Sequence, residues 1–218
     1  MRTQSQFGIL ISFLFLTGSF LVGGEGKLPN DVRWVRQSTE HKTLCEQLFR
    51  QATVTILRTV KTEKSTGNLA VVVDLDETVL DNSLYQVERW KAGLSFTQDS
   101  WSDWVNRKEA GLIPGAKEFL SAVRKKGVRV VFLSNRMNDN LEPTRGNLRL
   151  LGVLDSKDLF LLRLDKDDLK EVRRKEVTDG TGRMKKVGPL QVVGYVGDQM
   201  GDFPRVRTKE FGKTNFLL

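Results

Sequence analysis

The chain has 218 residues, enough for one domain with a hydrophobic core, and its 39% hydrophobic and 28% charged residues exclude an intrinsically disordered protein. The formal net charge of +8 is spread over segments of mixed sign, so we expect a soluble basic surface and no nucleic acid polymer as partner. Cys45 is the single cysteine and His41 the single histidine, which excludes an internal disulfide and a metal cluster built on Cys and His.

The N-terminal segment has the pattern of a signal peptide. Arg2 precedes an apolar stretch over residues 7–22, and small residues follow before Glu25. The stretch is shorter than the ~20 residues that a membrane-spanning helix needs. We therefore expect residues 1–24 to be a signal peptide and the protein to be exported, to the periplasm, the outer membrane or the medium. Membrane contact would come only through an uncleaved signal segment.

Residues 31–61 predict one long helix at the start of a domain that spans residues 25–218. Asp31 can cap this helix, which lies within residues 31–63. Apolar residues recur along it at near-helical spacing: Trp34, Leu44, Leu48, Ala52 and Leu57.

The rest of the chain alternates between short apolar runs and helical patterns. The runs, which predict buried parallel strands, cover residues 69–74, 128–133, 159–162, 191–196 and 216–218. The helical patterns between them cover residues 115–126, 140–151 and 168–176. This alternation predicts an α/β fold, a parallel sheet flanked by helices, with the ligand site beyond the carboxyl ends of the strands. Residues 82–113 do not fit the alternation and predict a helical insertion over that site.

Acidic residues follow two of these runs. Asp74 ends the first run and Asp76 lies two residues further on, while Asp198 follows the fourth run. Carboxylates held close together repel one another unless a cation intervenes, and Mg²⁺ prefers oxygen ligands of this kind. Phosphoryl transfer uses such a site: one carboxylate attacks phosphorus, and a second moves protons to and from the leaving group and water.

Other polar residues at the strand ends have two readings each. Ser134 can bind phosphate or cap a helix, and Lys170 can bind phosphate or lie on a solvated helix face. Asp202 can support a metal site or cap the next turn. Trp101 can stack on a substrate ring or belong to the core.

Several segments resemble the haloacid dehalogenase (HAD) superfamily, and within it the bacterial class C acid phosphatases with four signature aspartates. DLDETVLDNS at residues 74–83 is similar to the first motif of that group, FLSNR at 132–136 to the second, and GDQMGDF at 197–203 to the fourth. WSDW at 101–104 and IPGA at 113–116 are similar to its cap and post-cap segments.

The resemblance implies a role for each matching residue. Asp74 would be the nucleophile and Asp76 the acid/base. Mg²⁺ would be held by the Asp74 side chain, the Asp76 carbonyl and the Asp198 side chain, with support from Asp202. The other implied contacts are with phosphate, by Ser134, Asn135 and Lys170 (or Lys166 in its place), and with the rest of the substrate, by Trp101 and Arg136.

The resemblance also implies small phosphomonoester substrates, with nucleoside monophosphates as one candidate class. The family's C-terminal tail with Tyr and Trp is missing after Leu218, so we expect a truncated C-terminus. The alternative function is a catalytically weak or inert exported member that acts as a surface binding protein. The sequence is compatible with a homo-oligomer.

Overall fold

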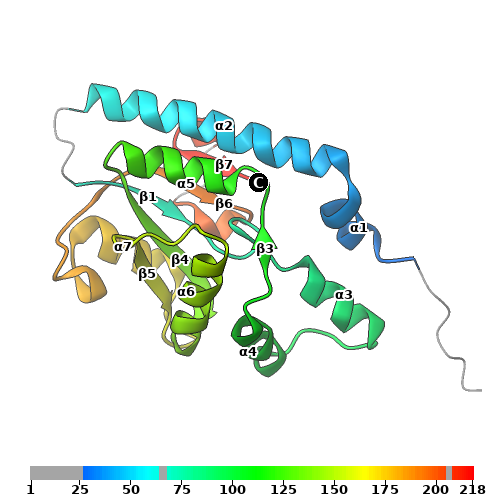
Figure 1. The fold of residues 1–218 in the computed structure, drawn as a ribbon. Helices are drawn as coiled ribbons and strands as arrows, with labels where there is room; N and C mark the ends of the chain where they lie inside the picture. The colour runs from blue at the N-terminus through cyan, green and yellow to red at the C-terminus, as the bar shows by residue number, and fades with distance from the viewer. Residues whose placement is uncertain (1–26, 64–67, 205–207) are drawn as a thin grey trace, which may run out of the picture.

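Five parallel strands form the centre of the molecule, in the order β5-β4-β1-β6-β7 (Figure 1). We use a computed structural model that describes residues 27–63, 68–204 and 208–218, so the predicted signal peptide lies outside the described residues. The strands are β1 (Leu69–Val73), β4 (Arg129–Met137), β5 (Leu159–Arg163), β6 (Gln191–Gly197) and β7 (Asn215–Leu217). The predicted parallel α/β sheet is therefore confirmed.

The central strand β1 shows why its sequence is wholly apolar. All five of its residues are buried, because helices cover both faces of the sheet. Leu69, Val71 and Val73 pack into the larger core cluster, which includes side chains of α2 and α5. Ala70 and Val72 point to the other face, where α7 contributes Val177.

Helices form the two outer layers. In Figure 1, α2 and α5 lie together above the sheet, while α7 lies below it. The helices that follow the first strand are α3 (Ser83–Lys91), α4 (Gln98–Arg107), α5 (Ala116–Lys125), α6 (Leu141–Leu150) and α7 (Lys170–Asp179). Short 3₁₀ turns cover Asn138–Asn140, Gly182–Met184, Met200–Asp202 and Thr208–Glu210. No helix of the described ranges is both long and apolar enough to cross a membrane.

The N-terminal helix is broken, and here the prediction of one helix was wrong. The structure has α1 (Asn30–Gln37) and α2 (Thr39–Thr62), separated at Ser38. Ser38 has an extended backbone, and its Oγ accepts a hydrogen bond of 3.0 Å from the backbone N–H of His41. A side chain that caps the next helix in this way favours a helix start over continuation. Asp31 lies in the first turn of α1 and does not cap it.

The predicted insertion is a pair of helices on a two-stranded stem. Strands β2 (Leu80–Asp81) and β3 (Gly111–Leu112) pair antiparallel and join α3 and α4 to the sheet domain. A capping box between Thr97 and Ser100 starts α4, and Lys108 in the left-handed conformation ends it. The stem begins seven residues after β1, so the insertion is attached beside the predicted site.

Candidate active site

The loop after β1 turns tightly around one carbonyl. The carbonyl oxygen of Leu75 accepts backbone hydrogen bonds from Val79 and Leu80, at 2.9 and 2.8 Å, while the Leu75 side chain is fully buried. Glu77 adopts a left-handed conformation with φ of 58°, which few residues other than glycine adopt. The turn leaves Asp74 and Asp76 on either side of a buried leucine.

Asp74 is nearly buried and directly contacts a cation. The Nζ of Lys170, the first residue of α7, lies 2.6 Å from its Oδ1 and also contacts Asp202. Burial raises the pKa of the Asp74 carboxyl, and the Lys170 ammonium opposes that shift. Burial alone would lower the pKa of Lys170, but the two carboxylates outweigh it and raise that pKa. Lys170 thus holds the Asp74 carboxyl group in position and favours its ionised form against the effect of burial.

Three acidic side chains meet at this end of the sheet. Oxygen atoms of Asp74, Asp198 and Asp202 all lie within 4.8 Å of one another. Burial raises the pKa of Asp198, and the neighbouring Asp202 raises it further. Only Lys170 forms an ion pair with this group among the described residues. A divalent cation bound by oxygen ligands fits such a donor set.

Glycine at position 197 allows this close approach. A Cβ atom there would lie 2.3 Å from Oδ2 of Asp202, closer than any side chain tolerates. The same Oδ2 accepts a 2.9 Å hydrogen bond from the backbone N–H of Gln199, within the short turn after β6. Gly197 and this turn together fix the Asp202 carboxylate against the end of the sheet.

Asp76 is held by a different set of groups. Its Oδ1 accepts hydrogen bonds from Arg136 Nη2 at 2.7 Å, Arg136 Nε at 2.9 Å and Asn82 Nδ2 at 3.0 Å. Within the described part of the chain, its Oδ2 has only longer contacts, from Arg136 Nε at 3.2 Å and Ser134 Oγ at 3.3 Å. The side chain remains 20% exposed. Oδ2 is thus the less engaged oxygen of this carboxyl group.

The buried contacts of Asp76 extend into the insertion. Asn82 is fully buried, and its Oδ1 accepts a 2.9 Å hydrogen bond from Nε1 of Trp104 on α4. Arg136 also donates to Thr144 Oγ1 on α6, at 3.0 Å. Sequence reasoning had not assigned a role to Asn82, Trp104 or Thr144. The available signals were the first motif, which contains Asn82, and the WSDW segment, which contains Trp104.

Arg136 and Trp101 were predicted to contact substrate, and the structure places both in packed surroundings. The Arg136 side chain is 1% exposed, and its guanidinium is bonded to Asp76. Trp101 is 9% exposed, with its ring centre 5.0 Å from that of Tyr85 and 5.8 Å from the Arg136 guanidinium. Their predicted substrate contacts stay predictions; the contacts seen here show Arg136 positioning Asp76, with Trp101 packed beside it.

The remaining predicted residues lie at the end of β4 and before α7. Ser134 is buried, and Asn135 is exposed with its Oδ1 accepting 2.7 Å from Arg173 Nη2. Sequence reasoning did not assign Arg173, which is fully buried behind this strand end. Lys166 is exposed on the loop before α7, so the structure brings Lys170 rather than Lys166 to Asp74.

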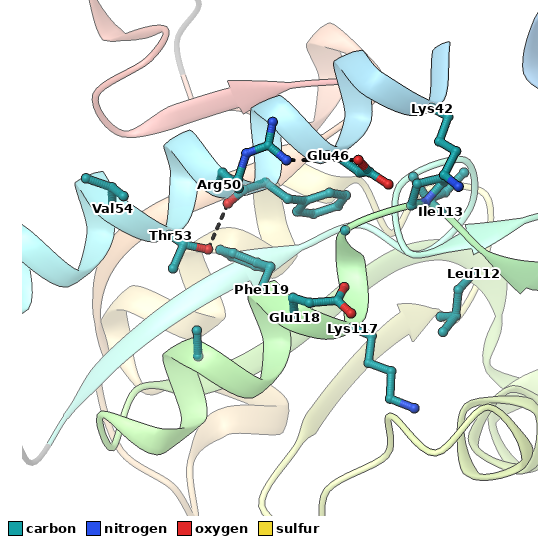
Figure 2. A pocket seen from close by; sticks show the side chains of 14 residues that line it. Lys42, Glu46, Arg50, Thr53, Val54, Leu112, Ile113, Lys117, Glu118 and Phe119 are labelled. Carbon is teal, nitrogen blue, oxygen red and sulfur yellow. Dashed lines mark hydrogen bonds and ion pairs between the residues drawn. The ribbon is translucent and has the colours of Figure 1, made fainter. Parts of the chain in front are cut away.

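A large apolar groove lies away from these residues. It has a volume of about 710 Å³ and runs between α2 and α5, where Figure 2 shows Glu46 and Arg50 of α2 and Phe119 of α5. Its lining contains none of the predicted site residues. The acidic cluster, rather than this apolar groove, is the candidate active site.

Comparison with known proteins agrees with the motifs. The model of the family described as HAD superfamily, subfamily IIIB (acid phosphatase), matches residues 25–218. A class C acid phosphatase from Bacillus anthracis with tungstate bound is similar in structure, with a TM-score of 0.74 and 28% sequence identity. A second structure of the Bacillus anthracis enzyme gives a TM-score of 0.73. Each match covers 85% of this chain and 80% of the other.

Curated relatives match over a shorter region. A stem 31 kDa glycoprotein of Glycine max is 26% identical over 136 residues, and a stem 28 kDa glycoprotein of the same plant is 27% identical over 133 residues. These matches cover 60% of this chain, and the chain spans about half the length of these relatives. The predicted resemblance to HAD acid phosphatases is confirmed by the family match and by the solved structures.

Proposed function

This chain belongs to subfamily IIIB of the HAD superfamily, the acid phosphatases, and we propose that it hydrolyses small phosphomonoesters through an aspartyl-phosphate on Asp74. One observation carries the proposal: Asp74 lies in contact with Lys170 and within a three-carboxylate cluster, while Asp76 is held apart from that cluster by Arg136 and Asn82. The two carboxylates therefore have surroundings suited to two different tasks.

Enzymes of the HAD superfamily generally use a divalent metal, and the acidic cluster can hold one. We propose Mg²⁺, with Asp74 and Asp198 as side-chain ligands, the Asp76 carbonyl as a further ligand and Asp202 in support. Three carboxylates, with one ammonium partner among the residues that the structure describes, have the charge and the oxygen donors that such an ion requires. When bound, the metal would offset the negative charge of the phosphate oxygens so that an anionic nucleophile can approach.

In the first step, a carboxylate oxygen of Asp74 attacks phosphorus, and the bond from phosphorus to the ester oxygen breaks. Lys170 and Ser134 bind phosphate oxygens. Asp76 donates a proton to the leaving alkoxide, so that the alcohol departs neutral. Oδ2 is suited to carry that proton, because Oδ1 already accepts three hydrogen bonds.

In the second step, water attacks the phosphorus of the aspartyl-phosphate. Asp76, now ionised, takes a proton from this water, and the bond between phosphorus and the Asp74 oxygen breaks. Inorganic phosphate leaves, Asp74 is again a carboxylate and Asp76 is again protonated. Arg136 and Asn82 keep the same carboxyl group in place for both proton transfers.

Phosphate release from p-nitrophenyl phosphate tests the proposal. We expect turnover that requires added Mg²⁺ and is lost in Asp74→Asn. Asp167→Asn is a matched control, because Asp167 is an exposed carboxylate on the loop before α7. If the wild-type protein hydrolyses this substrate no faster than Asp74→Asn does, the result would instead support an inert surface binding protein.

Export of the protein is a separate proposal that rests on residues 1–24 alone. Expression in a bacterial host and N-terminal sequencing of the periplasmic product would test it. A product that begins near Glu25 is expected, and a cytoplasmic product that begins at Met1 would contradict it.

A further inference from the structure

A pocket of about 300 Å³, lined mostly by polar and charged residues, adjoins the candidate active site on the side of α7. Three of its lining residues border or belong to that site. Lys170 contacts Asp74, Asn135 follows Ser134 at the end of β4, and Gly201 precedes Asp202. A group bound in this pocket would therefore lie next to a phosphate bound at Asp74.

Two arginines on the wall of this pocket form no ion pair with a carboxylate among the residues that the structure describes. Arg163 donates from Nε to the carbonyl of Asp165 at 2.8 Å and from Nη2 to that of Lys166 at 2.6 Å. Arg174 donates from Nη1 to the carbonyl of Gly201 at 2.7 Å. Neutral carbonyls orient both guanidinium groups and leave their charges unneutralised.

The acidic residues of the pocket do not cancel these charges. Asp168 forms a 2.9 Å ion pair with Arg183 and lies 3.5 Å from Arg173, so its charge is already matched. Glu171 is exposed at the rim. Burial lowers the pKa of the Arg174 guanidinium, and the charges of Asp202 and Glu171 oppose that shift without cancelling it.

We propose that this pocket binds a second anionic group of the substrate, a phosphate or a carboxylate, through Arg163 and Arg174. The inference rests on the proposed function, and it narrows the substrates to phosphomonoesters with another anionic group elsewhere in the molecule. Guanidinium groups fit such oxyanions because their planar N–H donors can bind two oxygens at once. Fixed guanidinium groups also lose little conformational freedom on binding.

The test compares three series of substrates with two to six carbons: alkanediol bisphosphates, ω-carboxyalkyl phosphates and hydroxyalkyl monophosphates. At the best length we expect kcat/KM for an anionic series to exceed that of the hydroxyalkyl series by about tenfold or more, chiefly through KM. The series that shows the preference identifies phosphate or carboxylate as the second group. In the double variant Arg163→Gln, Arg174→Gln this ratio should fall close to one.

Lys175→Gln is the matched control, because Lys175 follows Arg174 on α7, is exposed and does not line the pocket. It removes one positive charge and should keep the wild-type ratio, which separates the pocket from the general attraction of a basic surface. Equal kcat/KM for all three series, or the same ratio in the double variant and in Lys175→Gln, would overturn the inference.

Turnover of p-nitrophenyl phosphate in the same preparations separates this inference from the proposed function. If that substrate is hydrolysed without any preference for the anionic series, only the second-anion pocket is wrong. If nothing is hydrolysed, the proposed function fails, and calorimetric binding of the same compounds to Asp74→Asn decides the pocket by itself. A tenfold tighter binding of an anionic series would then support it, and equal binding would refute it.

Discussion

Asp74 and Asp76 lie two residues apart, yet different regions of the molecule hold them. The Asp74 side consists of charged groups at the carboxyl edge of the sheet, with Lys170 and Asp202 in direct contact. The Asp76 side consists of Arg136 and Asn82, and Asn82 is bonded in turn to Trp104 of the helical insertion.

This difference separates two requirements of the proposed reaction. The nucleophile and the metal need carboxylates close together, and the ends of neighbouring parallel strands supply them. The acid/base needs one carboxyl group held at a fixed orientation away from that cluster, and a buried arginine and amide supply this. The helical insertion is thus connected to the proposed acid/base, Asp76, by hydrogen bonds through Asn82 and Trp104.

Asp74→Asn should have the largest effect, because an amide is neither a nucleophile nor a good metal ligand. We expect turnover of p-nitrophenyl phosphate to fall by more than about 10⁴-fold. Calorimetric titration should also show much weaker Mg²⁺ binding. Retained Mg²⁺ affinity in this variant would mean that Asp74 does not belong to the metal site.

Asp76→Asn should distinguish most clearly between the roles of Asp74 and Asp76, because it should lower turnover without lowering Mg²⁺ affinity. Turnover should fall by ~10²–10⁴-fold, because proton transfer to the leaving group is lost. Mg²⁺ affinity should remain close to that of the wild type, since only the carbonyl of this residue is proposed as a ligand. Equal loss of metal affinity in both asparagine variants would contradict the division of roles.

Gly197→Ala tests the packing on the Asp74 side without removing a charged group. The added Cβ would lie 2.3 Å from Oδ2 of Asp202, so this carboxylate must move. We expect Mg²⁺ affinity and kcat/KM to fall by about 10- to 100-fold, as for other changes that displace groups behind a metal ligand. Gly201→Ala is the control, because a Cβ there meets nothing within 4 Å.

Trp104→Phe tests the Asp76 side and should have the smallest effect. It removes the Nε1–H that donates to Asn82 and keeps an aromatic ring in the core. A neutral hydrogen bond contributes about 1 kcal/mol, so we expect kcat to fall about two- to fivefold with little change in KM. Trp90→Phe, at a side chain that is 37% exposed, should leave kcat unchanged. If Trp104→Phe lowers thermal stability but leaves kcat unchanged, this hydrogen bond has a structural role and does not affect catalysis.

The parallel sheet and its acidic edge could be predicted from local patterns. The run 69–73 is wholly apolar because both faces of β1 are covered, and that requirement is visible in the amino acids themselves. The break at Ser38 could not be predicted from apolar spacing, because the spacing continues across it while a single hydroxyl caps the new helix. Start signals of this kind depend on one side chain rather than on a repeating pattern.

The sequence by itself determined which strand ends carry the polar residues of the site: carboxylates follow β1 and β6, and Ser134 lies within β4. These follow from rules that act over a few residues and from the convergence of parallel strand ends. Only the tertiary structure decided that Lys170 rather than Lys166 reaches Asp74, and that Arg136 is buried against Asp76. These pairs are 96 and 60 residues apart in the chain, so their contacts depend on how α7 and β4 pack beside β1 and not on any local preference.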